Sequence, residues 1–457
     1  MMSTKAIQRD LTGAVKADGL TKRKVAQADE YPLGSLRQGL ENYYKDILIE
    51  NLDIAYKVSY VKNRPIPFLR LYRYKEAFSF DFVNDFLDKF HANHNDYVFD
   101  PFSGLGTTAY TSMLRGIPSI GVDKLPIAYF SSKTLPLFLS LKENELTQKW
   151  RALIPELDNN KPANIASDVA IMKIAFAEET LAMLRKIKST IDAQPNPYRD
   201  ILLLLFFSIL DECSLTSKDG QFLRLKPDKK TSDPIEAMNR KVSQVEEDIQ
   251  RMKLLNPRIA ISDEIIPDVF LGDTRDLSDI KFKKNPTILI TSPPYVNRYD
   301  YTRSYSLELC FHFVKNFEEL KILRFGILRS HVESKIGKEE GSPHPVITEI
   351  LDALSNKPLN NPRIPIMITT YFIDMQKVIK EWFRVLAPGA HVAMVVDNVR
   401  FEGELIPVDL ILSKMAEEAG FTVKEVIVAR YKGNSSQQMK KYGRVPVRES
   451  IVVWEKQ

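Results

Sequence analysis

The segment that most constrains the fold runs from Asp96 to Pro126, with the sequence DYVFDPFSGLGTTAYTSMLRGIPSIGVDKLP. Residues 97–99 are typical of a buried strand, residues 107–115 of a helix, and residues 119–122 of a second strand. Two strands that are joined by a helix lie parallel to each other in one sheet. The segment therefore predicts a βαβ unit, and with it a sheet that is rich in parallel strands.

The rest of the chain alternates between strands and helices, except in one long stretch. Strand–helix alternation resumes after Pro267, whereas residues 136–260 carry only helical spacing. An amphipathic helix is also predicted over residues 71–91, where phenylalanines recur at steps of four. This pattern predicts an α/β fold, with helices on both faces of a parallel-rich sheet and one inserted helical module. We expect four segments: an N-terminal arm and helix (1–60), a first α/β part (61–135), the helical insertion (136–260) and a second α/β part (261–457).

The composition excludes several classes of protein. A net charge of +5 and a pI near 8.8 are compatible with a nucleic-acid partner but support one only weakly. Two cysteines, Cys213 and Cys310, are too few for a disulfide framework or a structural zinc site, and six scattered histidines show no metal-ligand spacing, so no metal is predicted. The apolar run over residues 201–210 is too short to span a bilayer, and the N-terminus lacks the apolar region of a signal peptide. We therefore expect a cytoplasmic protein without membrane contact.

Two glycines and two aspartates mark a candidate ligand site. Gly104 and Gly106 lie between a strand and a helix, where a ligand meets backbone N–H groups and the helix N-terminus. Asp123 follows the next strand, where Rossmann-like sites hold a carboxylate against ribose hydroxyls; its alternative role is a helix cap. Asp273 follows a later strand and either accepts from the exocyclic amine of a bound base or is a turn aspartate. The phosphate-binding motifs GxGxxG and GKS/T are absent from the glycine turn.

The strand predicted over residues 287–290 is followed by Ser292-Pro293-Pro294-Tyr295. Prolines cannot continue a sheet ladder, and the first also biases Ser292 towards an extended backbone. The result is a rigid stub at the carboxyl end of a strand, where open α/β sheets bind their ligands. It presents one hydroxyl, one free carbonyl and one ring, which suits a small, flat, polar substrate.

Together, DPFSGLGTT, Asp123, GDTRDL and TSPPY resemble the amino-methyltransferases of DNA, which use S-adenosylmethionine. The resemblance covers roughly residues 60–135 and 265–457, and it implies a Rossmann-like methyltransferase fold with a mostly parallel, seven-stranded sheet. Serine at the start of SPPY is typical of enzymes that methylate cytosine N4, whereas adenine-N6 enzymes more often have aspartate or asparagine there. Many SPPY enzymes place the glycine motif after SPPY. Here it comes first, with about 185 residues between the two, so the place of the target-recognition region cannot be transferred from them.

The resemblance implies a set of residues that bind S-adenosylmethionine. The glycine turn would line the methionine part of the cofactor, Asp123 would hold the ribose, and Asp273 would lie beside the adenine. The sequence YRYKEAFS, residues 72–79, resembles the motif that helps to close over the methionine end. The implied cofactor-binding residues are Tyr74, Lys75, Phe78, Asp100, Pro101, Phe102, Ser103, Gly104, Gly106, Thr107, Thr108, Asp123 and Asp273.

The resemblance also implies catalytic roles for Ser292, Pro293, Pro294 and Tyr295. The lone pair of an exocyclic amine is delocalised into the base. The Ser292 hydroxyl and the Pro293 carbonyl would accept hydrogen bonds from the two amine protons and so free that lone pair. The prolines fix both acceptors, and Tyr295 would stack on a target base flipped out of the duplex. Methylation of cytosine C5 would need a nucleophilic cysteine, usually after proline; both cysteines here stand in helical contexts and are predicted to be core thiols.

The implied function is site-specific methylation of cytosine N4 in double-stranded DNA, in a restriction–modification system with a cognate endonuclease as partner. Basic and aromatic side chains that suit contact with DNA are Arg298, Tyr299, Arg303, Lys218 and Arg224. Their alternative roles are an exposed amphipathic helix face and a solvated charged loop. Target recognition is expected in the helical insertion and in the loops after Tyr295, and residues 434–444 form another candidate DNA-facing loop. Methylation of adenine N6, methylation of RNA, and nucleic-acid binding without catalysis stay open at this point.

Overall fold

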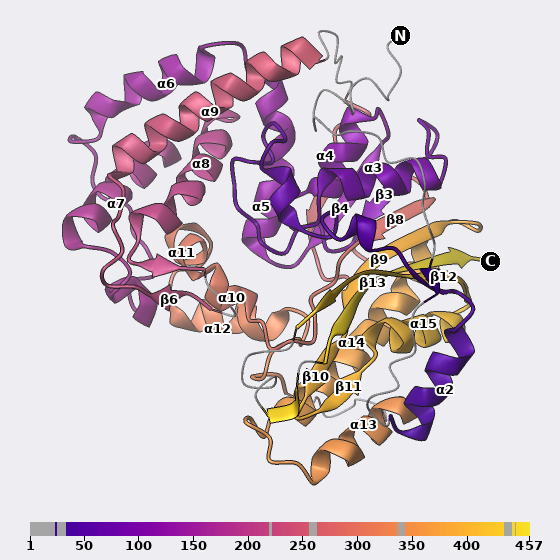
Figure 1. Cartoon of the computed structure of the whole chain (residues 1–457). Coiled ribbons are helices and arrows are strands. Elements are labelled where there is room, and N and C mark those ends of the chain that lie inside the picture. Colours follow the sequence, from indigo (N-terminus) through magenta and orange to yellow (C-terminus); the bar gives the residue numbers. More distant parts are fainter. Residues whose placement is uncertain are drawn as a thin grey trace.

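The computed structural model describes residues 23–24, 33–218, 222–255, 263–335, 337, 343–433, 441–443 and 445–457. Within these residues, a central sheet of nine strands has the order β1-β2-β12-β13-β9-β8-β3-β4-β7 (Figure 1). Its strands are β1 (Arg23–Lys24), β2 (Leu48–Glu50), β3 (Val98–Asp100), β4 (Ser119–Asp123), β7 (Asp268–Leu271), β8 (Ile288–Thr291), β9 (His391–Asp397), β12 (Phe421–Lys432) and β13 (Val447–Lys456). Residues 1–22 and 25–32 of the predicted N-terminal segment, and most of the loop at residues 434–444, lie outside the described residues.

The sheet is mostly parallel, as predicted. β7, β4, β3, β8 and β9 pair in parallel, and β13 lies antiparallel between β9 and β12. These six strands and β12 are the seven that the resemblance implied. Beyond β12 the sheet is wider than predicted, because β2 adds in parallel and β1 adds antiparallel to β2. These two strands have only two and three residues, too few to show the alternation by which a strand is recognised in a sequence.

Successive residues of each strand point to opposite faces of the sheet and enter different hydrophobic cores. In β8, Ile290 packs with α3 (Phe80–Lys89) on one face, whereas Leu289 packs with α14 (Ile364–Val385) and α15 (Val408–Ala419) on the other. Helices therefore cover both faces of the sheet, as the strand–helix alternation predicted. Burial on both faces explains why β8 is apolar throughout rather than alternating.

The helix predicted over residues 71–91 is shorter in the structure. α3 begins at Phe80, where the Ser79 hydroxyl accepts a hydrogen bond from the Phe82 N–H at 3.2 Å and caps the helix. The predicted row of phenylalanines packs ring against ring, with neighbouring centroids 4.8, 4.9 and 5.7 Å apart. Residues 71–79 are not helical, and part of this segment contributes to the candidate site.

The helical module lies at the left of Figure 1 and holds α6 (Glu145–Leu153), α7 (Glu178–Asp192), α8 (Tyr198–Cys213) and α9 (Pro234–Leu255). α8 is apolar on nearly all sides because it packs against α7, α9 and α5 (Pro126–Thr134). The module also contains a small hairpin that the sequence did not predict, formed by β5 (Thr216–Ser217) and β6 (Arg224–Leu225). Its core is continuous with residues 66–74 and 305–320, so the module shares one core with the α/β part.

The remaining α-helices and strands complete the α/β part. They are α2 (Ser35–Tyr44), α4 (Thr107–Leu114), α10 (Tyr301–Ser304), α11 (Ser306–Glu308), α12 (Phe317–Gly326), α13 (Pro345–Ser355), and the hairpin of β10 (Val399–Phe401) and β11 (Glu404–Ile406). Both cysteines are buried free thiols, as predicted. In the described part of the chain, no helix has the length and apolar character needed to cross a membrane.

Candidate active site

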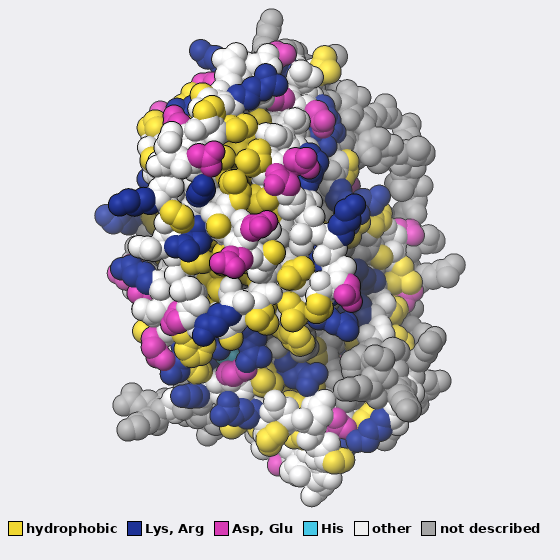
Figure 2. All heavy atoms as spheres, turned by 90° about the vertical axis from the view of Figure 1, so that its left-hand side faces the viewer, with side chains coloured by type: hydrophobic (Ala, Val, Ile, Leu, Met, Phe, Trp, Pro, Cys, Tyr) yellow, Lys and Arg dark blue, Asp and Glu magenta, His cyan; other side chains and the backbone are white. Residues whose placement is uncertain are grey.

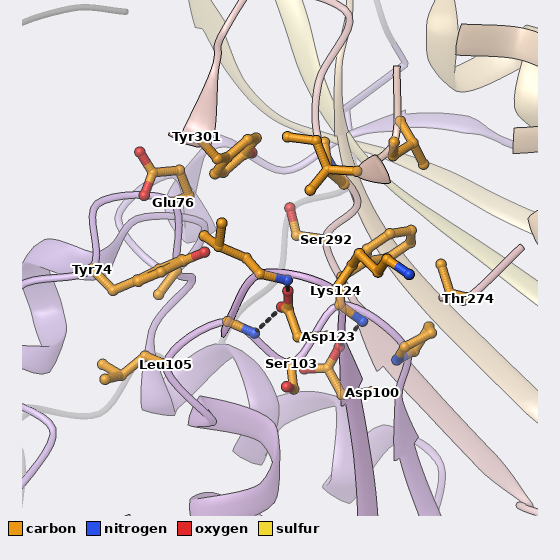
Figure 3. A pocket seen from close by; sticks show the side chains of 18 of the residues that line it. Tyr74, Glu76, Asp100, Ser103, Leu105, Asp123, Lys124, Thr274, Ser292 and Tyr301 are labelled. Carbon is orange, nitrogen blue, oxygen red and sulfur yellow. Dashed lines mark hydrogen bonds between the residues drawn. The ribbon is translucent and has the colours of Figure 1, made fainter. Parts of the chain in front are cut away.

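A cavity opens at the carboxyl ends of β3, β4, β7 and β8, the sheet edge where the sequence predicted a ligand site (Figure 3). It encloses about 830 Å³ of empty space, counted out to its open mouth. Segments that are far apart in the sequence meet there: 74–78, 100–107, 123–125, 272–274, 292–294, 301 and 327–328. The parallel sheet therefore brings the glycine turn, both strand-end aspartates and the SPPY loop to one recess.

Most of the predicted cofactor residues line this cavity. They are Tyr74, Phe78, Asp100, Pro101, Phe102, Ser103, Gly104, Thr107, Asp123 and Asp273. Lys75, Gly106 and Thr108 lie outside the lining. Thr108 Oγ1 donates a hydrogen bond to the Ile290 carbonyl at 3.3 Å, so it ties α4 to β8.

The glycine turn between β3 and α4 is held by the carboxylate of Asp123 (Figure 3). Gly104 has a φ of +51° and donates its N–H to Asp123 Oδ2 at 2.9 Å, and the Leu125 N–H donates to Oδ1 at 2.8 Å. The Ser103 hydroxyl is buried and has no hydrogen-bond partner in the part of the chain that the structure describes. A buried polar group without a partner is unfavourable, so this hydroxyl is suited to a polar ligand in the cavity.

Gly106 allows two helices to approach closely. Its φ is +93°, and a Cβ atom would lie 2.8 Å from the Cα of Ser132 in α5. We expect Gly106→Ala to lower the free energy of unfolding by roughly 2 kcal/mol in urea denaturation, because of the strained φ and the overpacking. Gly116→Ala is the matched control, since Gly116 also has a positive φ of +68°, but among the described residues other than its chain neighbours none has an atom within 4 Å of an added Cβ. Equal losses in the two variants would contradict a role for close packing.

Two carboxyl groups at the cavity have raised pKa values. Asp100 accepts hydrogen bonds from Thr291 Oγ1 at 2.7 Å and from the Phe102 N–H at 3.1 Å, and so joins the ends of β3 and β8. Burial raises the pKa of Asp100 and of Asp123 to about 6, although the hydrogen bonds that each accepts oppose the shift. Both groups therefore titrate within the pH range of ordinary binding experiments.

Asp273 lies at the cavity wall with its carboxylate already paired. Arg275 donates to Asp273 through Nε at 2.9 Å and through Nη2 at 2.7 Å. Burial acts to raise the pKa of Asp273, but the hydrogen bonds and charge of Arg275 outweigh it and hold the pKa below its usual value. A contact between this carboxylate and adenine stays a prediction, and it would have to use lone pairs that Arg275 does not occupy.

Among the cavity-lining side chains that the sequence analysis did not single out are Glu76 and Tyr301 (Figure 3). Glu76 accepts a hydrogen bond from the Tyr305 hydroxyl at 2.5 Å, and the Tyr305 ring stacks on Tyr74 with centroids 4.9 Å apart. Tyr301, on α10, also faces the cavity. Both residues stand in segments that were quoted for other residues, but no sequence pattern indicates which side chains of an irregular loop point inwards.

Some residues of the SPPY loop line the cavity, and Tyr295 contacts the sheet instead. Ser292 and Pro294 line the cavity, and Figure 3 shows the Ser292 side chain reaching into it. Pro293 is buried. Tyr295 lies outside the cavity lining, and its hydroxyl donates a hydrogen bond to Glu449 Oε1 on β13 at 3.1 Å. The ring predicted to stack on a target base is therefore anchored to the sheet in this structure, and stacking stays a prediction.

Four of the five side chains predicted to contact DNA reach the surface to different degrees. Arg224 is exposed on β6, and Arg303 is half exposed and paired with Glu333 at 2.6 Å. Arg298 is partly buried, which lowers its pKa, and it has a φ of +69°. Tyr299 is partly buried beside the cavity residue Tyr301, with ring centroids 4.9 Å apart.

Lys218 requires a correction, because its ammonium group is not available at the surface. It pairs with Glu308 at 2.5 Å, with the two side chains only 5% and 2% exposed. The Tyr72 hydroxyl donates to the same Glu308 oxygen at 2.8 Å, and Lys218 Nζ lies 4.2 Å from the centre of the Tyr305 ring. Lys218 therefore joins the helical module to α11 in the interior and offers no charge to a phosphate here.

The chain is similar to several known proteins over almost its whole length. It is 33% identical to the type II methyltransferase M.BsoBI of Geobacillus stearothermophilus, with 92% of each chain covered. It is 32% identical to the type II methyltransferase M.AvaI of Anabaena variabilis, with 93% of this chain and 94% of that one covered. A shorter stretch, 19% of each chain, is 35% identical to M.MjaII of Methanocaldococcus jannaschii. No protein-family model matches the chain.

Among solved structures, the rRNA methyltransferase AviRa of Streptomyces viridochromogenes aligns with 84% of this chain and 87% of that one, at 10% identity. Its TM-score of 0.30 is too low to carry an argument about this protein.

The cavity suits the cofactor that such enzymes use. It offers a carboxylate at the end of the second strand for a ribose, an unpartnered buried hydroxyl, and aromatic walls beside Glu76. Within the described residues, no group of three or more His, Cys, Asp or Glu side chains is placed to hold a metal ion. Identity above 30% over more than nine-tenths of the chain shows that the protein belongs to the type II methyltransferases, with S-adenosylmethionine as its methyl donor.

Proposed function

We propose that this protein methylates the exocyclic N4 of cytosine at a specific site in double-stranded DNA. One observation carries the proposal: the hydroxyl of Ser292 faces the same cavity as Asp123 and the glycine turn. A methyl donor held by the turn and an amine held by Ser292 would then meet inside one recess. Serine at the first position of SPPY favours cytosine N4 over adenine N6 as the acceptor.

The residues around the cavity would hold S-adenosylmethionine from end to end. Asp123 would accept hydrogen bonds from the ribose hydroxyls with the lone pairs that its two backbone donors leave free. Ser103 would bond a polar group of the methionine part, while Tyr74 and Glu76 would close that end. Asp273 would lie beside the adenine. When bound, the cofactor supplies a methyl group activated by a neighbouring sulfonium.

The pH dependence of cofactor binding tests the role of Asp123. Its pKa of about 6 lies above the usual value, and the ionised form is the better acceptor for two ribose hydroxyls. Binding should therefore be constant above pH 7 and weaken about tenfold between pH 7 and pH 5 in titration calorimetry. Asp123→Asn should bind more weakly but lose this pH dependence. A variant that keeps the same pH dependence would assign the titration to another group, such as Asp100.

The protein's own part in the chemistry is to free the lone pair of the target amine. Conjugation makes that nitrogen a poor nucleophile, and two hydrogen-bond acceptors can draw its protons out of the plane of the base. Ser292 Oγ would be one acceptor and the Pro293 carbonyl the other, and Pro293 and Pro294 would keep both in place. The target base must leave the duplex to reach this recess, and Tyr295 or Tyr301 would contact its ring.

The type II methyltransferases that resemble this chain support a place in a restriction–modification system, with an endonuclease that acts on the same site as partner. Cofactor binding is assigned to residues 61–135, catalysis to residues 261–457, and target recognition to the helical module, residues 136–260.

Figure 2 shows the face of the molecule on the side of this module, where Lys and Arg side chains mix with acidic and apolar ones and gather in the lower part of the view. Arg224, Arg298, Tyr299 and Arg303 would contact the DNA backbone near the recess.

A label-transfer experiment tests the substrate class. Purified protein is incubated with S-adenosylmethionine carrying a tritiated methyl group and with duplex DNA, single-stranded DNA or total RNA. We expect label in duplex DNA, at a level that saturates with the number of target sites, and labelling that is about 10²–10³-fold slower with Ser292→Ala. Label in RNA alone would move the function to RNA, and cofactor binding without label in any nucleic acid would indicate a non-catalytic binder.

A further inference from the structure

A buried carboxylate on β13 lies behind the SPPY loop. The Glu449 side chain is only 2% exposed. It pairs with two cations of the neighbouring strand β12: Arg430 Nε bonds Oε2, and Lys432 Nζ bonds Oε1 at 2.6 Å. Both carboxyl oxygens of Glu449 therefore accept from cationic donors, Oε2 from Arg430 and Oε1 from Lys432. In this arrangement the side chain faces any further donor as a hydrogen-bond acceptor.

A chain of two hydrogen bonds leads from this carboxylate to the cavity. The Tyr295 hydroxyl donates to Glu449 Oε1 at 3.1 Å, and the Ser292 hydroxyl donates to Tyr295 Oη at 3.4 Å. Each hydroxyl has one proton and two lone pairs. Because the Tyr295 hydroxyl donates its one proton to Glu449, the Tyr295 oxygen can only accept a hydrogen bond from Ser292. The Ser292 hydroxyl in turn donates its one proton to Tyr295.

We propose that Glu449 is a positioning residue that fixes which group donates in both hydrogen bonds, so that the lone pairs of Ser292 face the target amine. The inference rests on the proposed function, in which Ser292 accepts a hydrogen bond from that amine. A free serine hydroxyl would rotate, and in some orientations it would point its proton at the amine protons. The buried carboxylate removes those orientations before the substrate arrives, which is preorganisation of an acceptor.

The sheet topology makes this arrangement possible. β13 runs antiparallel between β12 and β9, which places Glu449 opposite Arg430 on one side and opposite Asp397 on the other. Lys432 also pairs with Asp397 at 3.1 Å. Among the described residues, the charged and titratable groups that face Glu449 are Arg430, Lys432, Asp397 and the Tyr295 hydroxyl. Burial and the nearby charge of Glu449 raise the pKa of Asp397, whereas Lys432 and Arg430 oppose the shift.

Tyr295→Phe tests the proposal, because it removes the hydroxyl and keeps the ring. We expect the single-turnover rate of methyl transfer to fall about tenfold, with unchanged affinities for S-adenosylmethionine and for the duplex. Tyr431→Phe is the matched control. The Tyr431 hydroxyl also donates to a carboxylate, Glu50 Oε2 at 3.0 Å, but this bond is exposed and lies near the C-terminal end of β12. The control should keep the wild-type rate. If Tyr295 served only to stack on the base, Tyr295→Phe would also keep it, and the proposal would be overturned.

Glu449→Gln is a second test, because an amide can donate a hydrogen bond to Tyr295 and so reverse the donor–acceptor direction of both hydrogen bonds. We expect it to slow methyl transfer to a similar degree, and the double variant with Tyr295→Phe to be no slower than either single variant, since both act through Ser292. Additive losses would overturn the proposal. If Glu449→Gln fails to fold, Tyr295→Phe decides alone. Ser292→Ala distinguishes the two levels: a wild-type rate in that variant would reject the proposed function itself, whereas a Ser292→Ala variant slowed by about 10²–10³-fold with a fully active Tyr295→Phe would reject only the role of Glu449.

Discussion

Ser292→Ala is expected to lower the rate of methyl transfer by about 10²–10³-fold, the range found when one preorganised hydrogen-bonding group is removed from an active site. The hydroxyl faces the cavity, and its proton is held by Tyr295, so the substitution removes an oriented acceptor and little packing. Affinity for S-adenosylmethionine should stay within about twofold, because the proposed cofactor contacts come from other segments. Single-turnover kinetics with saturating cofactor measures the chemical step directly.

An exposed serine outside the site controls for this substitution. Ser355, at the end of α13, donates a hydrogen bond to the Asp352 carbonyl at 2.7 Å and is exposed. Ser355→Ala should therefore transfer the methyl group at the wild-type rate. A Ser292→Ala variant that also works at the wild-type rate would show that the hydroxyl takes no part in the reaction.

Lys218→Met is expected to destabilise the protein by about 3–5 kcal/mol, because it leaves Glu308 buried without its cation. In the structure the two side chains are 5% and 2% exposed and 2.5 Å apart, and the second oxygen of Glu308 has no hydrogen-bond partner among the described residues. Urea denaturation, followed by circular dichroism, measures the loss. The double variant Lys218→Met/Glu308→Gln should recover much of it, since it removes the unpaired charge as well.

The exposed pair of Lys253 and Glu143 provides the comparison. These side chains are 55% and 45% exposed and 3.0 Å apart, so Lys253→Met should change the stability by less than about 1 kcal/mol. A role for Lys218 in DNA contact predicts a different result: unchanged stability, weaker duplex binding and a shallower dependence of that binding on salt. That result would contradict the buried position of the ammonium group.

Local patterns were sufficient to predict the central part of the fold. The glycine turn and its flanking strands were predicted because short-range sterics and periodicity determine them. The helix after the turn begins at Thr107 as predicted, and β4 ends at Asp123. The prolines after β8 likewise end that strand close to the predicted position, at Thr291. Because parallel strands share one carboxyl edge, these local predictions also located the recess.

Contacts between segments that are distant in the chain could not be predicted from the sequence. Whether Lys218 faces water or Glu308, 90 residues further along the chain, depends on how the helical module packs. The bond between Tyr295 and Glu449 joins residues 154 positions apart, and no periodicity in the sequence links them. The start of α3 at Phe80 was missed because the aromatic spacing continues back to Phe78, which lies in a loop that lines the cavity and not in the helix.

The identity of the methylated nucleoside tests the central claim most directly. Unmethylated plasmid DNA is incubated with the protein and S-adenosylmethionine, digested to nucleosides and analysed by mass spectrometry, beside a reaction with Ser292→Ala. The proposed function predicts N4-methyldeoxycytidine with the unaltered protein and, in the same reaction time, about 100-fold less or lower still with the variant. N6-methyldeoxyadenosine would contradict the assignment of cytosine while leaving the fold and the methyl donor in place.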